Sequence, residues 1–66
     1  MSIRVACNRC DEVVVTTAVM PLSKREIAAL AAHVRACARI APAERPAGSP
    51  SLAQLLPFFD VDIQLG

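Results

Sequence analysis

The chain has 66 residues, of which 55% are hydrophobic, and its net charge at neutral pH is +1. A single domain of this length has a small core, so a source of stability beyond apolar packing is expected. The near-neutral charge excludes a strong general attraction to nucleic acids or to anionic membrane surfaces. A membrane span is not predicted, because Lys24, Arg25 and Glu26 interrupt the longest apolar run.

The N-terminal segment has the pattern of a β-hairpin with a tight turn. Apolar and polar residues alternate over residues 2–6, and a β-branched run over residues 12–18 is typical of a return strand. Between these strands, residues 7–10 predict a knuckle in which Asn8 takes up the tight backbone conformation. Residues 20–22 contain a proline and are expected to connect the hairpin to the next element.

A helix is predicted from Ser23 to about Ile40, ending before Pro42. Ser23 and Glu26 have the spacing of a capping box, which satisfies two backbone N–H groups at the helix start. The face expected to be buried has three- and four-residue spacing and holds Ile27, Leu30, Val34 and Cys37, with His33 beside them. Another face is rich in small residues, namely Ala28, Ala29, Ala32 and Ala36.

The C-terminal third divides into a connection and a turn followed by a strand. Residues 41–50 hold three prolines and a glycine, which indicates a linker or an ordered crossing. Ser51 is expected to cap a helical turn over residues 52–56, which Pro57 ends. Its L-x-x-L-L sequence is interpreted as core packing. Alternation of apolar and polar residues over 59–65, with an apolar and an acidic face, predicts a third strand, with a disordered tail as the alternative.

All three cysteines and the only histidine fall in one pattern, C-x2-C followed after 22 residues by H-x3-C. Thiolate and imidazole are the donors that Zn²⁺ prefers in a tetrahedron. The pattern therefore predicts one structural Zn²⁺ with four ligands and no open coordination position: Cys7, Cys10, His33 and Cys37. The alternatives are a redox dithiol formed by Cys7 and Cys10, and cysteines that bind no metal.

The order strand, knuckle, strand, helix and H-x3-C resembles the ββα zinc finger in its Cys-Cys-His-Cys form. The resemblance covers residues 3–37 and includes Leu30, three residues before His33. It departs from the family in a Cys10-to-His33 gap that is about ten residues longer and in its lack of core aromatic residues. The positions with which such fingers read DNA fall on Glu26, Ala28, Ala29 and Ala32. Three alanines offer no donors or acceptors to a base edge.

The predicted fold is thus a small α+β zinc-stapled domain, a β-hairpin with a zinc knuckle plus one helix. Residues 1–40 form the ββα finger, residues 41–50 the linker and residues 51–66 the C-terminal turn and strand. This last segment is expected to pack on the finger or on a partner chain.

We expect a non-catalytic protein–protein interaction module, with a homodimer as one form of it. The expected contact surfaces are the face of Ala28, Ala29, Ala32 and Ala36, or the strand that begins at Phe59 and ends at Leu65. Catalysis is not expected, because the metal uses the only histidine and every thiol.

The alternative function is a small nucleic-acid-binding regulator whose basic residues gather on one side. A redox switch that releases zinc is a third. No secretory signal is recognised before the first strand, and reduced cysteines suit the cytoplasm, which is the expected location.

Overall fold

A three-stranded antiparallel sheet forms one layer of the fold in the computed structural model, which describes residues 1–65. Its strands are β1 (Ser2–Cys7), β2 (Val13–Thr17) and β3 (Phe59–Gln64), in the spatial order β2-β1-β3. The central strand β1 therefore joins the hairpin to the C-terminal strand. Ile3 lies opposite Thr17 on one side and opposite Ile63 on the other.

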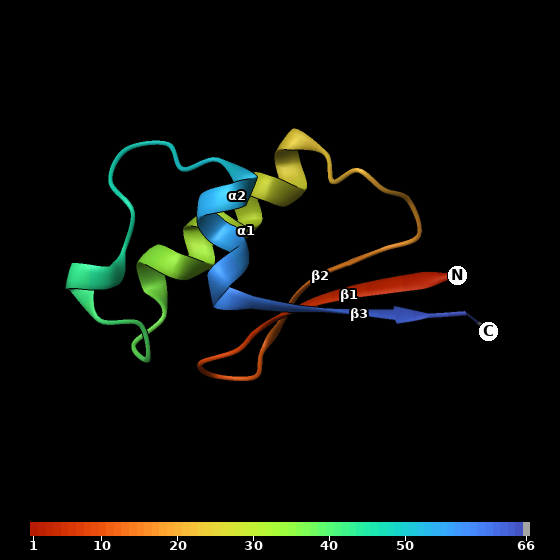
Figure 1. Ribbon diagram of the computed structural model, residues 1–66, viewed down its shortest axis with the longest axis horizontal. Coiled ribbons are helices and arrows are strands. Elements are labelled where there is room, and N and C mark those ends of the chain that lie inside the picture. Colours follow the sequence, from red (N-terminus) through yellow and green to blue (C-terminus); the bar gives the residue numbers. More distant parts are fainter. Residues whose placement is uncertain (66) are drawn as a thin grey trace.

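The helices gather over one end of this sheet. They are α1 (Lys24–Ala36), a 3₁₀ turn η1 (Pro42–Glu44), α2 (Leu52–Leu55) and a second 3₁₀ turn η2 (Leu56–Phe58). Figure 1 shows α1 and α2 close together above the sheet, while the end that carries both termini projects away from them. None of the helices in residues 1–65 has the length and apolar character needed to cross a membrane.

The core lies between the sheet and these helices. Alternation along β1 turns Ile3, Val5 and Cys7 inward, where each is 1% exposed, and leaves Arg4 exposed on the other face. The buried cluster that joins sheet and helices holds Val5, Cys7, Val15, Leu22, Leu30, Ala31, Val34, Cys37, Ile40, Leu55, Phe58 and Phe59.

The start of α1 confirms the predicted capping box. The Glu26 backbone N–H donates to Ser23 Oγ at 3.2 Å, and the Ser23 N–H donates to Glu26 Oε1 at 2.8 Å. These two bonds satisfy N–H groups that have no partner within the helix.

The predicted end of the helix was wrong, because α1 stops at Ala36 and not near Ile40. Cys37 has extended backbone angles of φ −70° and ψ 117°. The Arg45 guanidinium donates to the carbonyl oxygens of Cys37 (3.0 Å) and Ile40 (3.1 Å). These two carbonyls follow the last residue of α1, and the Arg45 side chain satisfies them from outside the helix. The turn after Cys37 lets Ile40 enter the core, where it is 1% exposed.

The knuckle also differs from the prediction. The residue with a left-handed backbone is Asp11, at φ 63°, and not Asn8; aspartate is among the few residues that adopt this conformation readily. Asn8 instead ties the knuckle to η2. Its backbone N–H donates to the Phe58 carbonyl and its Nδ2 donates to the Pro57 carbonyl, both at 2.9 Å.

The predicted third strand is confirmed as β3, which pairs along its length with β1 of its own chain. The turn before it is longer than expected, because Pro57 lies inside η2 and does not end the helical segment. A proline fits the first turn of a helix, where its missing N–H is not needed. Leu55 is fully buried. Gly66, the last residue of the predicted segment, lies outside the described residues.

Candidate metal centre

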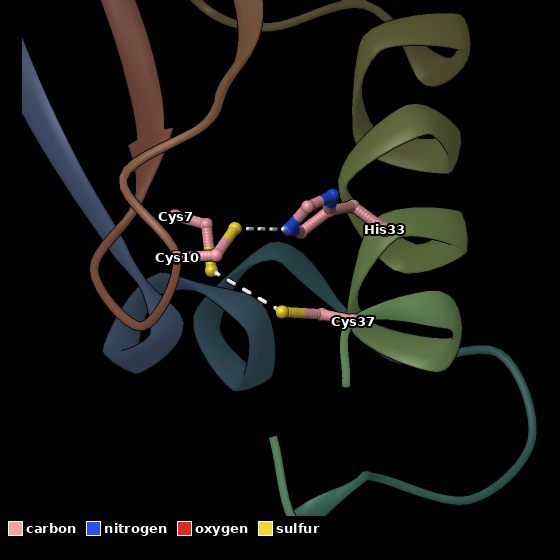
Figure 2. Close-up of side chains that lie close together, drawn as sticks. All are labelled: Cys7, Cys10, His33 and Cys37. Atoms are coloured by element: carbon pink, nitrogen blue, oxygen red, sulfur yellow. Dashed lines mark hydrogen bonds between the residues drawn. The ribbon is translucent and has the colours of Figure 1, made fainter. Parts of the chain in front are cut away.

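The four predicted ligands meet where the hairpin faces the end of α1. Cys7 ends β1 and Cys10 lies in the turn that follows, whereas His33 lies in the last turn of α1 and Cys37 caps it. Figure 2 shows the two pairs pointing toward one another, one from the hairpin and one from the helix. The Cys37 N–H donates to the His33 carbonyl at 2.8 Å, which fixes these two ligands about one helical turn apart.

The spacing of the donor atoms suits a single ion. Their ligand atoms all lie within 4.8 Å of one another, with 4.0 Å between Sγ of Cys7 and Sγ of Cys37 and 3.4 Å between Sγ of Cys10 and Nε2 of His33. Bond lengths of ~2.3 Å to sulfur and ~2.0 Å to nitrogen in a tetrahedron require S–S and S–N separations of about 3.8 and 3.5 Å. The limit of 4.8 Å exceeds these separations by about 1 Å, so the group could hold one metal ion after small movements of the side chains.

The site is closed on the core side and open on the other. Cys7 and Cys37 are buried, whereas Cys10 is exposed and the His33 side chain keeps 12% of its surface accessible. A hollow of about 370 Å³ lies on the open side. Its lining residues are Cys10, Glu12, His33, Ala36, Cys37, Ala38 and Arg39.

Glu12 lies beside the histidine ring. Its Oε2 is 3.2 Å from His33 Nδ1, while Nε2 of the same ring faces Cys10. A proton on Nδ1 would be directed toward this carboxylate, and the Nε2 lone pair would then be free for a metal. The sequence pattern predicts Glu12 only as the first residue of the return strand over residues 12–18. An acidic residue two positions after the second cysteine was the signal that could have identified it.

The thiols and nearby backbone N–H groups perturb one another. The Glu12 N–H lowers the pKa of Cys10, but desolvation and the thiols of Cys7 and Cys37 outweigh it, and that pKa is raised. Burial raises the pKa of Cys37, but the Arg39 N–H and neighbouring thiols outweigh burial, and that pKa is lowered. Metals bind the thiolate form, and N–H groups directed at sulfur stabilise its negative charge.

The connection over residues 41–50 is fastened to this end of the molecule. Arg9 of the knuckle and Glu44 of η1 form two hydrogen bonds, at 3.0 and 3.3 Å. The pKa of Glu44 is lowered, first by the hydrogen bonds from Arg9, then by the Ala41 N–H and by the Arg9 charge. The Arg9 and Glu44 side chains are 38% and 43% exposed, so the pair adds little stability. It does hold η1 beside the knuckle.

The alanines predicted as one contact face are divided by the structure. Ala28, Ala32 and Ala36 are exposed, but Ala29 is half-buried and packs against the core. Ala31, which was not assigned to the buried face, is 7% exposed and belongs to the core. The exposed alanine surface is therefore narrower than predicted.

The hairpin, the helix and the Cys/His group together are consistent with a zinc-binding ββα domain, here extended by a third strand on β1. Comparison of the chain with protein families, with curated proteins and with solved structures gives no match.

Proposed function

We propose that this chain is a non-catalytic domain stapled by one structural Zn²⁺ and that it acts as a protein–protein interaction module. Three thiols and one imidazole whose ligand atoms lie within 4.8 Å of one another favour zinc over harder cations. All four positions around such an ion belong to protein ligands, so no site remains for a reactive water. Reduced thiolate ligands also suit the cytoplasmic location that we propose.

The observation that carries the interaction role is the uncovered end of β3. Phe59 at its start is 6% exposed, whereas Val61, Ile63 and Leu65 are 46%, 55% and 82% exposed. Single exposed apolar residues are common on protein surfaces. Three that follow one another on one face at the edge of a sheet mark either a binding surface or a site of aggregation.

The position of β3 in the sheet suits this role. It is the last strand in the order β2-β1-β3, and no other strand within residues 1–65 pairs with its outer side. Such an edge can accept a further strand, whose backbone provides affinity and whose alternate side chains provide specificity. A second copy bound in this way would be the homodimeric form of the proposal.

Metal content and selection of ligands test the two halves of the proposal separately. Native mass spectrometry is expected to show one Zn²⁺ per chain. A library of displayed peptides, panned against the zinc-loaded protein, is expected to yield ligands that bind wild type and fail to bind Ile63→Lys. Leu56→Lys is the matched control, since Leu56 is 42% exposed but lies outside β3. Ligands that bind Ile63→Lys as well as wild type would refute the role of β3.

A further inference from the structure

The outer edge of β3 presents two rows of side chains that differ in chemistry. One row is apolar: Val61 and Ile63 lie on the face that Phe59 turns toward the core, and Leu65 follows directly after the strand. The other row is acidic and holds Asp60 and Asp62, which are both exposed. A strand bound at this edge would meet apolar groups on one face and carboxylates on the other.

The register fixes which backbone groups point outward. The Asn8 N–H donates to the Phe58 carbonyl, so these two residues form a hydrogen-bonded pair. The pairs Ala6–Asp60 and Arg4–Asp62 follow at steps of two residues along both strands. In an antiparallel ladder, hydrogen-bonded pairs alternate along the strands. The backbone N–H and C=O groups of Asp60 and Asp62 therefore bond to β1. The backbone groups of Val61 and Ile63 point toward the free edge.

The inner neighbour of β3 shows which kind of strand complements it. β1 places Val5, Arg4 and Ile3 opposite Val61, Asp62 and Ile63, in that order. Apolar side chains thus meet apolar ones, and a cation stands across from a carboxylate. Cross-strand pairs of both kinds are stabilising.

We propose that the free edge of β3 binds an extended segment of another protein in which apolar residues alternate with lysine or arginine. The inference rests on the proposed function and adds the class of partner. The apolar residues of the segment cover Val61 and Ile63, its cations approach Asp60 and Asp62, and its backbone pairs with the edge. Because the chain has a net charge of +1, it does not attract cations as a whole, and the selectivity arises at this strand.

A second copy of the chain fits this edge less well. If two β3 strands paired antiparallel about Val61, Asp60 of each would lie opposite Asp62 of the other, and like charges opposite one another are destabilising. Pairing about Ile63 avoids this clash, but it joins only residues 61–65. It also keeps both acidic rows on one face of the sheet.

Three end-capped synthetic octapeptides test the partner class on the zinc-loaded full chain by fluorescence anisotropy. The first alternates Val and Arg, the second alternates Val and Glu, and the third has four Arg followed by four Val. The first is expected to bind about tenfold more tightly than either of the others, and added salt is expected to weaken it. Amide NMR shifts are expected at Val61 and Ile63.

Two double variants with equal changes of charge sharpen the test. Asp60→Asn with Asp62→Asn is expected to remove the preference for the Val-Arg peptide. Ala43→Lys with Ala47→Lys changes net charge by the same amount at exposed positions of the connection over residues 41–50 and is expected to retain it. Thermal melting confirms that each variant is folded.

The outcomes separate the two proposals. Equal binding of the Val-Arg and Val-Glu peptides, with shifts at Val61 and Ile63, would overturn the basic partner and leave edge docking standing. If none of the three peptides binds and the amide signals of Val61 and Ile63 do not shift, the proposed class of partner is overturned. If the displayed library also yields no ligand that requires Ile63, docking at the edge of β3 is overturned as well. Sedimentation that reveals a dimer occluding β3 would make the second copy the occupant and overturn this inference.

Discussion

Phe59 and Ile63 lie on the same strand and the same face, yet Phe59 is 6% exposed and Ile63 is 55% exposed. The difference follows from what lies above each residue. Phe59 belongs to the cluster that joins the sheet to the helices, and its ring lies 6.1 Å from that of His33. Ile63 lies near the C-terminal end of β3, which projects away from the helices in Figure 1. Alternation in a sequence thus determines which face a side chain takes. Burial depends on whether another element covers that face.

The covered end is where segments distant in sequence are tied together. The Cys/His group joins the knuckle to α1, Asn8 joins the knuckle to η2, and Arg45 joins the connection to the end of α1. At the projecting end, the ladders between β1 and its two neighbours link the strands. We therefore expect perturbations of the covered end to affect the whole domain, and changes at the exposed side chains of β3 to affect mainly binding.

Removal of the metal is expected to have the largest effect, because it should unfold the whole domain, the covered end and the projecting end alike. Zinc binding to small domains provides ~10–16 kcal/mol, which exceeds the stability expected of a core this size. Chelation, or replacement of buried Cys37 by serine, should remove the cooperative thermal transition seen by circular dichroism. A chain that keeps that transition after complete chelation, verified by metal analysis, would contradict the structural role of the ion.

A paired substitution compares the strands directly at one register position. Ile3 and Ile63 lie opposite each other, but Ile3 is 1% exposed and Ile63 is 55% exposed. Ile3→Ala should lower the free energy of unfolding by about 2–5 kcal/mol, since it leaves a cavity. Ile63→Ala should cost less than ~1 kcal/mol, mainly through reduced strand propensity.

Urea denaturation of the zinc-loaded proteins measures both changes. Similar losses in the two variants would mean that Ile63 is covered in solution, for example by a second chain. A repeat at several protein concentrations distinguishes that case, since the stability of a dimer depends on concentration.

The Cys/His group that could hold a metal ion was predictable from sequence, because its residue types are rare here and their spacing matches a knuckle and a helix. The hairpin, the capping box and β3 followed from local patterns in the same way. What could not be predicted depends on contacts between distant segments. No local sequence pattern indicates that Arg45 contacts the end of α1. Its guanidinium nevertheless donates to the Cys37 carbonyl and stabilises the turn that ends α1 early. The exposure of Ile63 depends likewise on where the helices lie.

Replacement of Glu12 tests how firmly the covered end holds its metal. Glu12→Gln keeps the shape of the side chain, but its amide can donate to His33 Nδ1 and so favour a proton on Nε2, the atom that faces Cys10. Loss of such a partner typically weakens metal affinity by about 10–100-fold. Competition with a chromophoric chelator measures this change. Asp11→Asn is the control, because asparagine also accepts the left-handed backbone at that position and contacts no ligand ring.

The same variants can be followed with Co²⁺ in place of zinc. The d–d absorption of a tetrahedral cobalt site should persist in Glu12→Gln, since the four ligands are unchanged. Retained affinity in Glu12→Gln, equal to that of Asp11→Asn, would show that the Glu12 contact does not orient the ring.

A small effect on the whole domain is expected at the start of α1, ten residues before His33, the first predicted metal ligand of the helix. Ser23→Ala removes the hydroxyl that accepts from the Glu26 N–H and should cost about 1 kcal/mol. The pKa of Glu26 is lowered, first by the Ser23 backbone N–H and then by its hydroxyl. A lowered folded-state pKa means that this carboxylate stabilises the fold fully above its unfolded pKa of ~4.3, and that the contribution is lost as pH falls through the folded value.

Glu26→Gln isolates this contribution, because glutamine does not titrate and protonation of the metal ligands is common to both proteins. The difference in melting temperature between wild type and Glu26→Gln should stay constant above about pH 5 and shrink below it. A difference that does not change with pH would mean that the carboxylate charge contributes nothing to the cap. In that case the hydrogen bonds alone fix where α1 begins, and the helix start is independent of charge as well as remote from the metal.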